Sequence, residues 1–124
     1  TGQLTVDISE LGDPIRIGEA TDYEIRIRNA RSVADQNVVL RIEFPAGLRF
    51  DRLSGPVARR NVSADGRLVQ VSPILEVRAG ETIPSFHVEA TGVQVGEHKI
   101  RVVVTSQLSP QGVVAEEATS VTAQ

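Results

Sequence analysis

Hydrophobic and polar residues alternate with a period of two in several separate stretches of this chain. In residues 21–29, Tyr23, Ile25 and Ile27 share one parity, and polar or charged residues occupy the positions between them. This pattern is typical of a β-strand with one face on a core and the other in water. We therefore expect a half-buried strand here.

A second stretch contains a strand, a stop and an immediate restart. Residues 38–44 alternate in the same way and run into a Pro-Ala-Gly sequence at 45–47, after which Leu48 and Phe50 resume the apolar pattern. Proline removes a ladder donor and Gly47 can take a positive φ, so the strand is expected to end there. The pattern predicts a corner that returns the chain to the same core.

Other apolar stretches are separated by turn residues. Asp65-Gly66 is a strong indication of a hairpin, and Pro84 predicts an edge or a bulge at the start of its strand. Residues 29–36 are expected to form a polar loop. Further strands are predicted at 4–8, 57–62, 67–71, 75–77, 82–90, 98–105 and 113–121.

The overall pattern predicts an all-β sandwich made of two antiparallel sheets. It contains about seven to nine short strands at intervals of roughly 8–12 residues, and we find no convincing helical period. A length of 124 residues suits a single domain, residues 1–124. Because the chain opens on Thr1-Gly2 without Met, we expect it to be excised from a larger multidomain protein, with any secretion signal outside it.

Composition excludes several classes of function. Cysteine is absent, so disulfides, thiol catalysis and thiolate metal sites are not available. The net charge of −3 is mild and there is no block of like charge, so we expect no nucleic-acid partner. The longest apolar runs fall far short of the ~20 residues of a membrane helix, so we expect no direct membrane insertion.

A set of local motifs, taken in order, resembles a known family. The motifs are Gly18-Glu19 ahead of residues 23–29, then Asn37-Val38-Val39, residues 44–50, Ala79-Gly80-Glu81, and Gly96-Glu97 before the valine-rich strand. They are similar to those of the bacterial surface repeat domains of the DUF11 and CARDB (cell-adhesion-related) type, which have an immunoglobulin-like fold. The likeness covers most of the chain.

The resemblance implies an immunoglobulin-like β-sandwich that is repeated in tandem in a bacterial envelope or secreted protein. Such modules act as spacers or adhesion-associated domains, and the family has no shared catalytic residues. In one place the sequence departs from the family: Arg31 stands where a glycine usually follows the strand asparagine Asn29. The resemblance therefore does not fix the conformation of the loop at 29–36.

The residues themselves also favour a protein that is not an enzyme. Only His87 and His98 could act as a catalytic base, and no serine lies in a Gly-x-Ser-x-Gly setting. His87 is out of phase with the apolar residues around it and is expected on the solvated face. His98 begins a strand, where its imidazole can reach water. We predict no catalytic residues.

No metal or cofactor site is predicted. Two histidines without cysteine, and without His-x-x-x-His spacing, do not favour zinc. Calcium uses carboxylates from separate loops, and the carboxylates considered for it are Asp7, Glu10 and Asp13, or Glu116 and Glu117. Neither stretch has the Asp-x-Asp-x-Asp-Gly pattern, so solvated acidic loops are the better interpretation.

The aromatic residues do not favour sugar or single-stranded nucleic-acid recognition, because both need an exposed aromatic face. The aromatic residues of the sequence are Tyr23, Phe44, Phe50 and Phe86, and all four are at inward or corner positions of the predicted strands.

Arginine is the main basic residue, and its positions are expected on outer faces, the corner and the hairpin. Interspersed Glu24, Glu43 and Asp51 dilute the positive field, so a mixed, solvated surface is expected rather than a site for an anionic polymer. The arginines concerned are Arg26, Arg28, Arg41, Arg49, Arg52, Arg59 and Arg60.

Two hypotheses of function remain open. The first is a non-catalytic structural or interaction module, a spacer or adhesion-associated repeat, located outside the cell or in the cell envelope. Its partners would be neighbouring domains of the same chain, and another cell-surface protein or polymer. The second is an accessory glycan-binding or calcium-binding domain of a secreted enzyme. We expect the isolated domain to be a monomer, although uncovered first or last strands offer edges for pairing with another copy.

Overall fold

The computed structural model describes residues 4–10, 14–55, 60–63, 67–83 and 86–123. These residues form ten strands, and no helix occurs among them. The strands are β1 (Leu4–Glu10), β2 (Ile15–Arg16), β3 (Ala20–Asn29), β4 (Asp35–Glu43), β5 (Leu48–Ser54), β6 (Arg60–Val62), β7 (Leu68–Val77), β8 (Phe86–Gly92), β9 (Gly96–Thr105) and β10 (Val113–Thr122).

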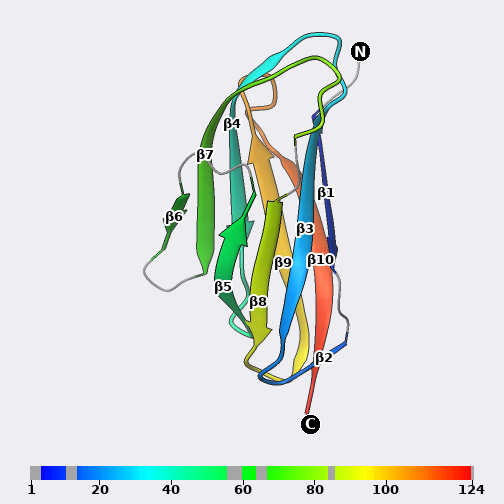
Figure 1. Ribbon diagram of the computed structural model, residues 1–124, viewed down its shortest axis with the longest axis vertical. Helices are drawn as coiled ribbons and strands as arrows, with labels where there is room; N and C mark the ends of the chain where they lie inside the picture. The colour runs from blue at the N-terminus through cyan, green and yellow to red at the C-terminus, as the bar shows by residue number, and fades with distance from the viewer. Residues whose placement is uncertain (1–3, 11–13, 56–59, 64–66, 84–85, 124) are drawn as a thin grey trace.

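The strands form two sheets that face each other (Figure 1). In the described part of the chain, one sheet has four strands in the order β1-β3-β8-β5, and the other has six in the order β2-β10-β9-β4-β7-β6. The predicted all-β sandwich is therefore confirmed. Neighbouring strands are antiparallel except for β2, which pairs with β10 in parallel, so the six-stranded sheet is mixed.

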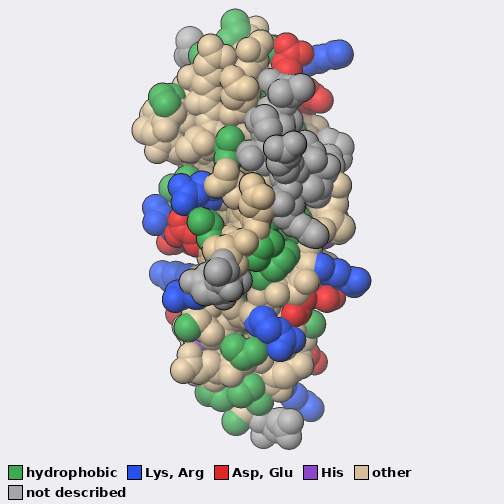
Figure 2. Space-filling view, turned by 90° about the vertical axis from the view of Figure 1, so that its left-hand side faces the viewer, with side chains coloured by type: hydrophobic (Ala, Val, Ile, Leu, Met, Phe, Trp, Pro, Cys, Tyr) green, Lys and Arg blue, Asp and Glu red, His purple; other side chains and the backbone are tan. Residues whose placement is uncertain are grey.

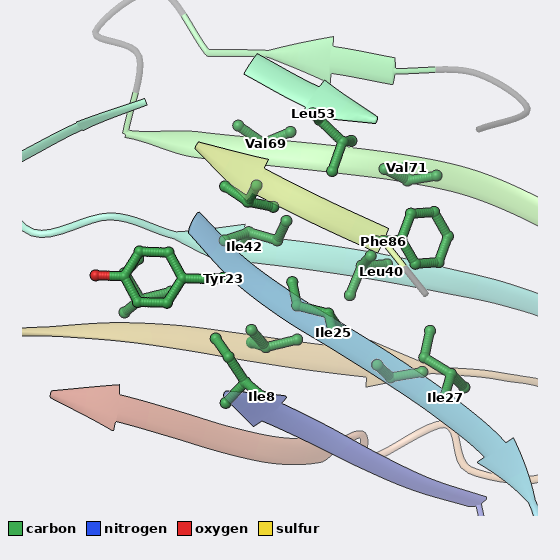
Figure 3. Packing of buried hydrophobic residues seen from close by; sticks show 14 of the residues in the cluster. Ile8, Tyr23, Ile25, Ile27, Leu40, Ile42, Leu53, Val69, Val71 and Phe86 are labelled. Carbon is green, nitrogen blue, oxygen red and sulfur yellow. The ribbon is translucent and has the colours of Figure 1, made fainter. Parts of the chain in front are cut away.

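The core lies between the sheets, as the alternation predicts. Tyr23, Ile25 and Ile27 of β3 are fully buried, and so are Leu40 and Ile42 of β4 in the other sheet. Figure 3 shows these side chains pointing toward one another between the two layers. Each large apolar side chain buried in this way contributes on the order of 1.5–3 kcal/mol to folding.

The predicted corner is confirmed by the path of the chain. Strand β4 ends at Glu43 in the six-stranded sheet, and β5 begins at Leu48 in the four-stranded sheet. Phe44 is buried just before the turn and Leu48 just after it. The rings of Phe44 and Phe50 pack with their centroids 5.5 Å apart and their planes at an angle of 46°. The chain therefore crosses between layers with core contacts on both sides of the crossing.

Gly47 is needed at this corner for a reason other than the predicted one. Its φ is not positive, whereas five other glycines of the described residues, among them Gly18 and Gly80, do have positive φ. A Cβ at Gly47 would lie 2.1 Å from Cε1 of His98, so the imidazole rests directly on the glycine backbone. Gly47 does not use the positive φ that a glycine permits, and close approach of a side chain is the actual requirement.

Some strand boundaries differ from the prediction. Strand β2 was not expected, because two residues are too few to show alternation; Ile15 and Arg16 pair with Val121 and Thr122. The strand predicted at 82–90 begins at Phe86 instead, and Thr82 makes only an isolated bridge. The predicted hairpin is confirmed by the pairing of β6 with β7.

Some predicted features fall on residues that the structure does not describe. The Asp65-Gly66 turn, Pro84 and the beginning of the strand predicted at 57–62 lie outside the described residues.

We expect Leu40→Ala to lower the free energy of unfolding by about 2–5 kcal/mol, because it removes buried contacts and leaves a cavity between the sheets. Denaturant unfolding followed by circular dichroism measures this loss. Val114→Ala is the control: Val114 is 47% exposed, so its loss should be within about 0.5 kcal/mol. Equal effects of the two substitutions would contradict the assignment of the core.

We expect Gly47→Ala to lower the free energy of unfolding by about 1–3 kcal/mol, because the new methyl group would overlap the imidazole of His98. The backbone of Gly47 itself accommodates alanine, so the cost should shrink to below about 1 kcal/mol when His98→Ala is also present. A double-mutant cycle of unfolding free energies checks this. Additive effects of the two substitutions would show that ring and glycine are not in contact.

Candidate functional site

The two histidines lie on different sheets and do not meet. His87 on β8 is 48% exposed, as predicted, and its Nε2 lies 3.9 Å from a carboxylate oxygen of Glu24. His98 on β9 is half-buried against Gly47, and its Nε2 lies 2.8 Å from the carbonyl oxygen of Gln94. The expectation that His98 simply reaches water was incomplete, because its ring packs on the corner. Ser54 pairs with His87 across β5 and β8 and lines the same hollow, but in the described part of the chain no hydrogen bond joins a hydroxyl to either imidazole, as a catalytic base would require.

The carboxylates considered for calcium do not converge either. Asp7 is exposed on β1, whereas Glu10 accepts a hydrogen bond from Thr119 of the other sheet. Glu116 and Glu117 are consecutive on β10, so their side chains point to opposite faces. No three His, Asp or Glu side chains of the described residues are close enough to hold a metal ion. Asp13 lies outside those residues.

All four aromatic rings have the predicted inward or corner placement. Tyr23 and Phe86 are fully buried, Phe44 is 3% exposed, and Phe50 is half-buried against the core. The hydroxyl of Tyr23 hydrogen-bonds to Thr119, which continues the polar contact to Glu10 across the two sheets. These rings therefore provide no flat exposed face for stacking.

The arginines lie among carboxylates, as predicted. On the outer face of the four-stranded sheet, Arg26 pairs with Glu24 at 2.8 Å and Arg52 with Glu89 at 3.5 Å. These pairs are exposed, so each contributes little to stability. The same face has a hollow of about 380 Å³ lined by Asp22, Arg52, Ser54, His87 and Glu89. Arg59 and the side chain of Arg60 lie outside the described part of the chain.

A buried polar cluster at one end of the sandwich was not predicted as such. Residues 29–36 were expected to be a polar loop, but Asp35 begins β4 and is fully buried. Arg31 donates to Asp35 Oδ2 at 2.9 Å and to Ser109 Oγ at 2.7 Å, and Ser106 donates to the same Oδ2 at 2.6 Å. The backbone N–H groups of Gln36 and Leu108 donate to Oδ1. We call these side chains the Asp35 cluster.

Asn29 links the Asp35 cluster to the end of β7. Its Nδ2 donates to the carbonyl oxygens of Val33 at 2.9 Å and Val77 at 3.1 Å, and its Oδ1 accepts from the N–H of Arg31. The side chain is fully buried, so its hydrogen bonds replace those lost to water. Only the departure from the family pattern at Arg31 pointed to this region in the sequence.

The Asp35 cluster is better suited to holding loops than to binding a ligand. Its members come from the β3–β4 loop and the β9–β10 connection. No buried side-chain nitrogen or oxygen among the described residues lacks a hydrogen-bond partner. A fully satisfied cluster leaves no group free for a ligand, so its effect is to fix the positions of two loops.

Two adjoining hollows surround the β4–β5 corner at the other end. One, of about 300 Å³, is lined by Pro45, Ala46, Leu48, Arg49, Phe50, Arg67 and Val93. The other, of about 260 Å³, is lined by Glu43, Phe44, Pro45, Arg67, Lys99, Arg101 and Glu116. We call the two hollows together the corner surface.

The part of the chain that the structure describes contains no helix able to cross a membrane.

Comparison with known proteins gives matches in fold only. No protein-family model and no curated protein matches the chain. Among solved structures, a cohesin module from a Clostridium perfringens family 33 glycoside hydrolase has a TM-score of 0.66 at 10% identity and covers 99% of this chain and 98% of its own. A CARDB domain from Pyrococcus furiosus, solved with di-metal ions, has a TM-score of 0.65 at 18% identity, covering 96% of this chain and 87% of its own.

A collagen-binding domain from a Staphylococcus aureus adhesin is similar to the same degree. Its TM-score is 0.65 at 10% identity, and the match covers 97% of this chain and 99% of that domain. The chain therefore has the sandwich fold of cohesin, CARDB and adhesin domains. At these identities the likeness establishes the fold and leaves the family and the role to other arguments.

We expect Asp35→Ala to lower the free energy of unfolding by about 3 kcal/mol, because it leaves the guanidinium of Arg31 beside an empty buried site. In a double-mutant cycle with Arg31→Ala, the coupling energy should exceed about 1 kcal/mol. The exposed pair Arg26 and Glu24 is the matched control, with a coupling of about 0.5 kcal/mol or less. Chemical unfolding of the variants provides these values. Similar coupling in both pairs would refute a stabilising role for the Asp35 cluster.

Proposed function

We propose that this chain is a non-catalytic structural or interaction module of a bacterial cell-surface or secreted protein. In this role it serves as a spacer or an adhesion-associated repeat. The observation that carries the proposal is the combination of a filled core with two ends that leave the sandwich at opposite poles. The position of the module outside the cell is part of the same proposal.

The shape supports a spacing role. In Figure 1 the N-terminus lies at one end of the long axis and the C-terminus at the other. Strands β3, β4, β9 and β10 have nine or ten residues each. Ten residues of strand extend about 33 Å. A domain joined at each end is therefore held apart by the length of the sandwich, and the ladders of hydrogen bonds resist extension.

The chemistry of the described residues supports a role without catalysis. His87 and His98 lie on different sheets, and the carboxylates of Glu24 and Glu89 are in ion pairs with arginines. The proteins of similar fold include a collagen-binding domain from an adhesin, whose name denotes binding rather than turnover.

A second candidate function is an accessory binding domain of a secreted enzyme. It is favoured by one observation: the cohesin module of similar fold comes from a glycoside hydrolase. In this case the loops at one end would bind a glycan or calcium, and the sandwich would position them beside a catalytic domain.

The test uses antibodies raised against the purified chain. We expect them to label intact cells of the source organism or to detect the protein in the culture medium, and external protease should remove the label from cells. An abundant cytosolic protein, protected from the protease, is the control. Detection only after lysis would contradict the proposal. Immunoprecipitated full-length protein that hydrolyses glycosides would favour the accessory domain instead.

A further inference from the structure

The corner surface combines an apolar floor with a fixed backbone. Its two hollows are neighbouring depressions at the β4–β5 corner, and both have Pro45 and Arg67 in their linings. The N–H of Val93 donates to the carbonyl oxygen of Gly47 at 2.9 Å, which ties the β8–β9 turn to the corner. The buried side chains of Phe44 and Leu48 fix the corner from below. The backbone around the two hollows is therefore preformed.

An apolar group is exposed at this surface. Val93 is 42% exposed, and the side chains beside it in the same hollow are mostly apolar. Figure 2 shows hydrophobic side chains gathered toward the lower end of the molecule with a basic side chain close by. A hollow of about 300 Å³ is large enough for one bulky side chain and small for a larger ligand.

The rim of the corner surface is positive although the chain as a whole is negative. Arg49, Arg67, Lys99 and Arg101 line the two hollows, against only two carboxylates, Glu43 and Glu116. The net charge of the whole chain is −3. The side chains of Arg49 and Arg101 are 64% and 50% exposed, and each is in an ion pair, Arg49 with Asp51 at 3.1 Å and Arg101 with Glu43 at 3.8 Å. Lys99 is exposed and is in no ion pair with the described residues. Basic side chains therefore outnumber carboxylates beside the apolar hollow, although two of the arginines are paired.

We propose that the corner surface binds an acidic segment of a partner protein, in which one bulky apolar side chain is flanked by carboxylates. The apolar side chain enters the hollow beside Val93 and Phe50, and the carboxylates meet Arg49 and Lys99 on the rim. This inference rests on the proposed function as an interaction module and names the class of its partner.

A peptide fits this surface better than a polysaccharide does. The floor consists of aliphatic side chains and a half-buried ring, Phe50, rather than of a flat exposed aromatic face. Sugar rings bind preferentially on such flat faces, whereas an aliphatic hollow accommodates a leucine or phenylalanine side chain. An acidic polysaccharide would use only the rim.

The experiment measures fluorescence anisotropy of fluorescein-labelled pentapeptides added to the full chain. The probes are Glu-Glu-Leu-Glu-Glu and Glu-Glu-Phe-Glu-Glu, compared with Glu-Glu-Ser-Glu-Glu and Lys-Lys-Leu-Lys-Lys. We expect the first two to bind about tenfold or more tightly than the serine peptide, because the apolar anchor is lost there. The lysine peptide should not bind.

Variants assign the binding to the corner surface. Val93→Ser should lower the affinity for the leucine peptide about threefold or more. The double variant Arg49→Glu with Lys99→Glu should lower it about tenfold or more. Val114→Ser is the matched apolar control, since Val114 is exposed to a similar degree on β10. Arg26→Glu with Arg28→Glu, on β3, makes the same change of net charge away from the corner. Both controls should bind like the parent chain.

Several outcomes would overturn the proposal. They are the absence of binding of both apolar peptides at millimolar concentration, equal binding of the serine peptide, and equal weakening by the control variants. Equal binding of the leucine and serine peptides, together with their displacement by polygalacturonate, would indicate a polysaccharide partner instead. Labelling of intact cells tests the proposed function separately, so a negative peptide result with positive surface labelling rejects only this partner.

Discussion

The packing of two sheets through their inward side chains is the constraint on which the other features of this molecule depend. Because side chains alternate along a strand, a shift of register by one residue would turn Tyr23, Ile25 and Ile27 toward water. All three are fully buried, as are Leu40 and Ile42 opposite them. In β3 the same register places Glu24 and Arg26 outside, where they form an ion pair of little energetic weight.

The β4–β5 corner connects this core to the surface. Phe44 and Leu48 are buried on either side of the turn, so the residues between them have a fixed position. His98 covers Gly47 from the neighbouring strand β9, which makes a glycine necessary there. Binding at the corner surface would therefore use a backbone that folding has already ordered, and little further entropy would be lost on binding.

The opposite end is stabilised by different chemistry. There Asp35 is fully buried, and its charge is balanced by Arg31 and by hydrogen bonds from Ser106 and two backbone N–H groups. A buried ion pair is weak evidence for net stability, but the loss of one partner is costly. The arrangement specifies the positions of two loops. The two poles thus differ: one is internally satisfied, whereas the other exposes apolar and basic groups.

The sequence by itself determined the sandwich, the parity of its strands and the crossing at residues 45–47, because alternation and turn chemistry are local properties of a chain. It also placed His87 outside and the aromatic rings inside. Only the tertiary structure decided that β2 pairs with β10, that Asp35 meets Ser106 from 71 residues away, and that an imidazole rests on Gly47. Such contacts join segments distant in sequence, so no local period reports them. The corner surface has the same origin, because its apolar and basic residues come from several strands and turns that only the folded chain brings together.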